Sequence, residues 1–128
     1  MKNDPLQVLV RSEGPWTVAE VVGELSYANA ARLRAALAAV WELPRPQQLV
    51  LELSQVGACD SGGMAAVLAL FRRVTVRGGS LVLVGTHGPM LELLKRTRTS
   101  ALMPMYDTLS QVPALPSNGG PRLTPQPA

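Results

Sequence analysis

Cysteine, histidine and aromatic residues are scarce in this chain of 128 residues, which has one Cys, one His and only 4% Phe, Trp and Tyr. One cysteine cannot form an internal disulfide, and one cysteine with one histidine cannot assemble a structural zinc site. The scarcity therefore predicts a protein of the reducing cytoplasm that holds no metal and no cofactor.

Charged residues and long apolar runs are also few. Only 16% of residues are charged and the net charge of +3 is scattered along the sequence, which argues against nucleic acid as a partner. Asp4 and Pro5 interrupt the N-terminal segment, and no apolar stretch reaches the length of a membrane span, so neither a signal peptide nor membrane insertion is predicted. What is plentiful is hydrophobic residues, at 47%, which predicts one folded domain.

The N-terminal half has the pattern of a hairpin followed by a helix. Residues 6–14 and 16–25 alternate apolar and polar side chains around a turn, which is typical of paired strands. Residues 26–43 are rich in Ala, Leu and Arg at helical spacing, with Ser26 or Asn29 as the expected cap. Pro44 and Pro46 are expected to end this helix.

The second half alternates strands and helices. We expect strands at 47–54 and 80–85, helices at 64–77 and 89–97, an edge strand within 101–107 and a helical turn at 108–112. This order predicts an α/β fold with a mixed sheet of four or five strands, an N-terminal hairpin and helices packed against the sheet. Residues 1–112 would form the domain, and the Pro- and Gly-rich residues 113–128 a disordered tail.

The segment CDSGGM, residues 59–64, places an acid, a hydroxyl and two glycines at the start of a predicted helix. A phosphate on Ser61 would face the free N–H groups of that helix and would change the local charge strongly. Alternatively, Asp60 and Ser61 simply cap the helix. Because Gly62 and Gly63 carry no side chain, the backbone of a partner could approach them closely.

Three chemical alternatives fit less well. A Ser61–His87 hydrolase would lack both a G-x-S-x-G elbow and an evident carboxylate to orient the histidine. The glycines are not followed by the Lys and Ser or Thr of a phosphate-binding loop. Cys59 is expected to pack as a small apolar residue between strand and helix. No catalytic residue is therefore predicted.

Four segments together resemble a STAS domain, the fold shared by anti-sigma factor antagonists and the cytoplasmic tails of sulphate transporters. The segment VVGELSYANAARLRAAL is similar to the G-E-L-D segment and first helix of that family, and LVLELSQVGACDSGGMAAVL to its D-L-S and D-S-S-G-L segments. VRGGSLVLVG and ALMPMYDTLSQV are similar to the glycine turn with its strand and to the closing elements. The resemblance spans nearly the whole predicted domain.

The resemblance implies a protein-binding module and not an enzyme. In anti-sigma factor antagonists the unphosphorylated domain binds an anti-sigma factor that is also a serine kinase, and phosphorylation of a Ser in D-S-S-G dissolves the complex. The usual acceptor position is Gly62 here, so either Ser61 accepts the phosphate or this switch is missing. The acid of G-E-L-D is replaced by Ser26, although Glu24 remains.

A second branch of the family matches the same residues. The small STAS subunit of lipid-transporting ABC systems has D-T-G-G-L where this chain has DSGGM, and there the hydroxyl would act in docking to the ATPase subunit. Either branch predicts a partner-binding surface centred on the loop and first helical turn of residues 59–64, joined by residues 24–26 if the neighbouring loop converges there. Its expected members are Glu24, Leu25, Ser26, Cys59, Asp60, Ser61, Gly62, Gly63 and Met64.

Overall fold

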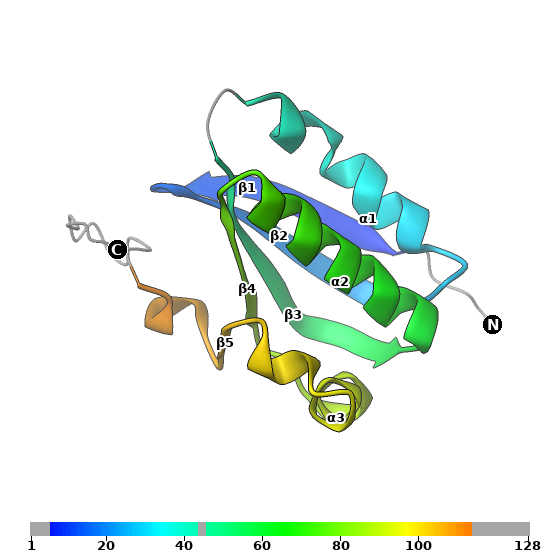
Figure 1. Ribbon diagram of the computed structural model, residues 1–128. Coiled ribbons are helices and arrows are strands. Elements are labelled where there is room, and N and C mark those ends of the chain that lie inside the picture. Colours follow the sequence, from blue (N-terminus) through cyan, green and yellow to red (C-terminus); the bar gives the residue numbers. More distant parts are fainter. Residues whose placement is uncertain (1–5, 44–45, 114–128) are drawn as a thin grey trace.

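The computed structural model describes residues 6–43 and 46–113, and these form a five-stranded mixed sheet with helices (Figure 1). This confirms the predicted fold class. In chain order the elements are β1 (Gln7–Glu13), β2 (Trp16–Leu25), α1 (Ala30–Ala36), the 3₁₀ helix η1 (Ala38–Glu42), β3 (Gln48–Cys59), α2 (Ser61–Val76), β4 (Ser80–Val84), α3 (Gly88–Arg96), η2 (Thr99–Ala101), β5 (Met105–Tyr106) and η3 (Leu109–Gln111).

The strands lie in the sheet in the same order as in the sequence. The hairpin strands β1 and β2 are antiparallel, and the pairs β2–β3, β3–β4 and β4–β5 are parallel. Each parallel step is joined by a helical crossover. As a result, β2 and β3 end at the same edge of the sheet, where Leu25 pairs with Cys59.

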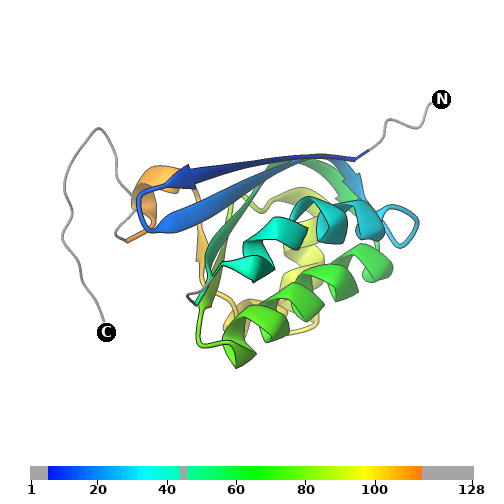
Figure 2. The ribbon, with the colours of Figure 1, turned by 90° about the horizontal axis from the view of Figure 1, so that it is seen from above.

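Helices α1, α2 and α3 cover one face of the sheet (Figure 2). Leucine dominates the core beneath them, with Leu25, Leu33 and Leu51 fully buried. Along α2, Met64, Val67 and Val74 face this core as predicted, while Leu68 and Phe71 are only half-buried. The burial of this apolar face fixes α2 over the centre of the sheet.

The opposite face carries a smaller apolar cluster close to η3. Trp16, Val18, Val50 and Val84 are buried there, and Val112 closes the cluster from the end of η3. The indole nitrogen of Trp16 donates a hydrogen bond of 3.1 Å to the carbonyl oxygen of Pro113. Except for Pro113, the predicted disordered tail lies outside the described residues.

Two elements differ from the sequence predictions. The helix expected over residues 26–43 is divided at Leu37 into α1 and η1, although its predicted apolar face is buried. Residues three apart eclipse one another in a 3₁₀ helix, so the tighter turn keeps Leu37 and Val40 on the sheet side. Strand β3 continues past residue 54 to Cys59, because the last residues of β2 pair with it through two register shifts.

No helix within the described ranges is both long and apolar enough to cross a bilayer.

Candidate functional site

Asp60 connects the start of α2 to the loop between β2 and α1. Its Oδ1 atom accepts a hydrogen bond of 2.8 Å from the backbone N–H of Gly63, so Asp60 is the N-cap of α2. The same carboxylate accepts the backbone N–H of Tyr27 at 3.0 Å, and the N–H of Asp60 donates to the Leu25 carbonyl at 3.2 Å. One side chain therefore joins the first turn of α2 to the β2–α1 loop, which is distant in the sequence.

Asn29 closes the β2–α1 loop. Its Oδ1 accepts the backbone N–H of Ser26 at 2.8 Å, and its Nδ2 donates to the Glu24 carbonyl at 2.6 Å. Asn29 occupies the N-cap position of α1, but its side chain bonds within the loop and not to an N–H of the helix. The closed loop presents Tyr27 to solvent with 83% of its surface exposed.

Ser61 is the first residue of α2 and is exposed. Within the described part of the chain its hydroxyl has no hydrogen-bond partner, because Asp60 already provides the side-chain cap. The capping interpretation therefore holds for Asp60 and does not account for Ser61. The first turn of α2 carries no acidic residue, so the positive end of the 16-residue helix dipole is not neutralised beyond the cap itself.

Gly62 and Gly63 make room for the protein's own loop. A Cβ on Gly62 would clash with the Cα and Cβ of Tyr27, and a Cβ on Gly63 would clash with the backbone carbonyl of Leu25. The expectation that these glycines admit a partner's backbone is therefore wrong for this structure, because the β2–α1 loop occupies that space. The contact leaves no room at position 62 for the hydroxyl side chain that the resemblance to the antagonists would imply.

A groove of about 450 Å³ opens beside this loop, between α1 and α2. Tyr27 and Gly62 border one end, and Arg34 from α1 adds a cation to its wall. Sequence interpretation missed this groove, although both helices contain alanine-rich runs that keep their facing surfaces shallow. Its alanine residues are Ala28, Ala30, Ala31, Ala65, Ala66 and Ala69.

The structure brings the predicted surface residues together but does not expose all of them. Leu25, Gly63 and Met64 are buried, so they position the loops and present no side-chain surface. Glu24, Asp60 and Ser61 are exposed, whereas Ser26, Cys59 and Gly62 are half-buried. Ser61, Gly62 and Gly63 belong to the first turn of α2 and not to a loop.

Cys59 is half-buried at the end of β3. Burial, and secondly the nearby charge of Asp60, raises the pKa of the Cys59 thiol to about 11. Its Sγ lies 3.5 Å from the carbonyl oxygen of Asp60, an acceptor for the S–H group. A neutral thiol of this kind is a poor nucleophile and a poor metal ligand near neutral pH.

His87 is the N-cap residue of α3, and its Nε2 lies 3.1 Å from the carbonyl oxygen of Ser54. This ring nitrogen thus contacts a backbone group, whereas a hydrolase would need Ser61 on one ring nitrogen and a carboxylate on the other. In residues 6–43 and 46–113 there is also no group of three or more His, Cys, Asp or Glu side chains that could hold a metal ion.

The sequence profile of the STAS domain matches residues 7–112, which are the sheet, all three α-helices and η3. The chain belongs to the STAS domain family. An anti-sigma F factor antagonist of Paenibacillus polymyxa is 22% identical to this STAS domain over 102 residues, covering 80% of this chain and 87% of the relative.

Solved structures of similar fold carry related descriptions. An anti-sigma factor antagonist from Mycobacterium paratuberculosis is 26% identical and superposes with a TM-score of 0.72, covering 82% of this chain and 88% of the other. An anti-sigma-factor antagonist (STAS) domain protein from Planctomyces limnophilus is 18% identical with a TM-score of 0.73, covering 81% and 92%. The Paenibacillus polymyxa and Mycobacterium paratuberculosis proteins are both described as anti-sigma factor antagonists.

Proposed function

We propose that this protein is an anti-sigma factor antagonist, which binds an anti-sigma factor through the start of α2 and the β2–α1 loop. The observation that carries the proposal is the exposed hydroxyl of Ser61, which stands at the positive end of α2 while Asp60 makes the cap. The descriptions of the relatives support the same class of partner. The protein would act in the cytoplasm, without a cofactor, as a regulator of transcription.

The proposed binding surface combines polar groups with a groove. Glu24, Asp60 and Ser61 would supply exposed polar contacts, with Ser26, Cys59 and Gly62 at their margin. Tyr27 adds a large exposed ring of the kind enriched in protein interfaces. The groove between α1 and α2 continues this surface and would accept apolar side chains of the partner.

Phosphorylation of Ser61 would control the interaction. A phosphate at this residue adds a charge of about −1.5 to −2 and would be stabilised by the helix N-terminus. A partner that buries Ser61 would then have to desolvate this charge, which opposes binding. Gly62 is closed to a hydroxyl-bearing side chain by Tyr27, so Ser61 is the acceptor that we propose.

A kinase assay tests the proposal. The protein is incubated with ATP and with each serine-kinase anti-sigma factor encoded by its source organism, and the phosphate is mapped by mass spectrometry. We expect incorporation at Ser61 and none in Ser61→Ala, with Ser110→Ala as a matched control on an exposed serine of η3. Incorporation that is the same in Ser61→Ala would reject Ser61 as the acceptor.

The second candidate is the STAS subunit of a lipid-transporting ABC system, which would bind the ATPase subunit. The tight contact between Gly62 and Tyr27 favours it, because that branch has glycine where the antagonists carry a hydroxyl. Absence of phosphate transfer together with co-purification of an ABC ATPase would decide for this candidate.

A further inference from the structure

The two edges of the sheet are protected to different degrees. Strand β5 has only two residues and is followed directly by η3, whereas β1 has seven residues. All seven pair with β2 without a register shift, and within the described residues no strand pairs with the outer side of β1. Edge strands are commonly blunted by lysine, proline or a bulge, and β1 has none of these.

The side chains of β1 favour pairing of this edge with another strand. Leu9 is 55% exposed and Val10 41% exposed, and they project to opposite faces of the sheet because side chains alternate along a strand. The charges of the strand are already paired, since Arg11 and Glu13 form a salt bridge of 2.6 Å. The outer side of β1 therefore offers free backbone groups flanked by apolar side chains. The strand itself carries no unpaired charge within the described residues, although Arg32 of α1 lines the groove beside it.

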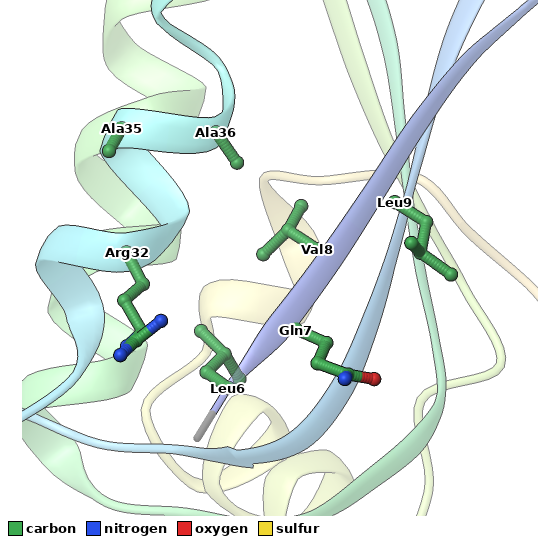
Figure 3. Close-up of a pocket in the computed structure, with 7 residues that line it drawn as sticks. All are labelled: Leu6, Gln7, Val8, Leu9, Arg32, Ala35 and Ala36. Atoms are coloured by element: carbon green, nitrogen blue, oxygen red, sulfur yellow. The ribbon is translucent and has the colours of Figure 1, made fainter.

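A groove runs beside the edge on the helical face. It has a volume of about 430 Å³ and lies between β1 and α1 (Figure 3). Leu6 and Val8 point toward α1, whose Ala35 and Ala36 are too small to fill the space. An added strand would place alternate side chains over this groove.

The sequence of β1 is complementary to itself in one register. In an antiparallel pair about a two-fold axis through Leu9, each Leu9 lies opposite its copy and each Val8 lies opposite Val10. Gln7 then lies opposite Arg11, and a neutral polar residue next to this cation causes no charge repulsion. Moving the axis to Val10 would pair the two Val10 residues and overlap all seven residues of the strand, but it would place Leu9 opposite Arg11 and Val8 opposite Ser12.

Moving the axis to Val8 is also unfavourable. It would place Leu9 opposite Gln7, and only residues 7–9 of the strand would overlap. The register centred on Leu9 is the one that pairs both exposed apolar residues with apolar partners over five residues of each strand.

From this geometry we infer that β1 pairs with β1 of a second copy of the protein, in the register centred on Leu9. The two sheets then become one continuous sheet, and the Val10 side chain of each copy lies opposite Val8 of the other copy, beside that copy's groove. Pairing along a seven-residue edge strand buries less surface area than a standard protein–protein interface, which buries about 1,600 Å². The dimer is therefore expected to be reversible and concentration-dependent.

Cysteine cross-linking tests the register. In a Cys59→Ser background, Leu9→Cys places two thiols opposite each other, and mild oxidation should yield a covalent dimer. Val10→Cys on the same strand lies opposite Val8, and Val76→Cys lies on α2 at an 86% exposed position. Both control variants should cross-link at least about tenfold more slowly than Leu9→Cys. Equal rates for the three variants would overturn the inferred register.

Sedimentation equilibrium of the full chain tests the dimer itself. Leu9→Lys would bring two ammonium groups together at the axis and should weaken dimerisation about tenfold, while Val76→Lys should have no effect. Circular dichroism checks that both variants are folded. A wild-type protein that stays monomeric, or a dimer unaffected by Leu9→Lys, would overturn the inference. A monomer in which Leu9→Cys resists alkylation would also overturn it, and would show that another part of the same chain covers the edge.

Discussion

The two ends of α2 both carry a pair of glycines, yet the pairs serve different purposes. At the start, Gly62 and Gly63 allow the β2–α1 loop to lie directly on the helix. At the end, Gly78 adopts a φ of 83° that leads the chain out of the helix, and Gly79 packs on the backbone of Gln47. The first pair shapes a surface, whereas the second pair ends a helix.

The polar groups at the two ends also differ. At the end of α2, Arg73 and Arg77 lie over the ring of Trp41, with centroid distances of 4.2 and 5.6 Å. Arg77 also donates to the Trp41 carbonyl at 3.4 Å. These cations already have intramolecular partners, while Ser61 at the start has none within the described residues. The start of α2 is therefore the end at which we propose that a partner binds.

Filling the space at Gly63 should have the largest effect on stability. Gly63→Ala places a Cβ against the Leu25 backbone, which cannot move without disturbing β2. We expect the free energy of unfolding to fall by about 1–3 kcal/mol. Chemical denaturation measures this, with Gly57→Ala as the control because a Cβ there meets nothing within 4 Å. Equal stability of the two variants would contradict the close packing at the start of α2.

Removing the carboxylate of Asp60 should have the next largest effect. Asp60→Ala loses the cap on Gly63 and the bond from Tyr27, so the free energy of unfolding should fall by about 1–2 kcal/mol. Asp60→Asn keeps an acceptor oxygen and should recover most of this loss. If the two variants were equally unstable, the hydrogen bonds would not be the source of the effect.

Changing the opposite end of α2 should cost less. Arg73→Ala removes the closer cation from the Trp41 ring, and a partly exposed contact of this kind contributes about 0.5–1 kcal/mol. Arg72→Ala on the same helix is the control, because Arg72 makes no such contact in the described structure. A loss larger than that of Asp60→Ala would reverse the proposed contrast between the two ends.

The smallest expected effect at neutral pH concerns Cys59, because it appears only at alkaline pH. Because the pKa of its thiol is raised to about 11 in the folded protein, the unfolded chain loses this proton first as pH rises. The contribution of the protonated thiol to the free energy of unfolding is therefore fully present below the ordinary thiol pKa and is lost as pH approaches 11. The free energy of unfolding of the wild type should fall more steeply between pH 9 and 11 than that of Cys59→Ser. Parallel curves would show that the thiol is not perturbed.

Much of the fold could be predicted from the sequence because its apolar periodicity matches its burial. The faces of α1 and α2 and the short buried strands were all visible as patterns, and the two proline residues near 44 marked a true end of the helical segment. The division of that segment at Leu37 was not visible, because it depends on how Leu37 and Val40 meet the sheet. At Leu37, tertiary contacts determine where the α-helix ends and the 3₁₀ helix begins.

The candidate site was predicted only in part. The position of Asp60 and Ser61 at a helix start follows from local pattern, but the bond from Tyr27 to Asp60 joins residues 33 apart in the sequence. The contacts that explain Gly62 and Gly63 are equally non-local. Asn29 was visible locally as a possible cap of α1, but its bonds within the loop were not, and Tyr27 and the groove between α1 and α2 had no local sequence signal beyond the alanine-rich helices.

The affinity of the protein for the proposed anti-sigma factor partner tests the central claim most directly. Isothermal titration calorimetry would compare the wild type with Ser61→Asp, Ser61→Asn and the control Ser110→Asp. If the start of α2 is the contact surface, Ser61→Asp should weaken binding at least about tenfold, while Ser61→Asn, which adds no charge, and Ser110→Asp should have much smaller effects. Equal affinities for the wild type and Ser61→Asp would contradict the account.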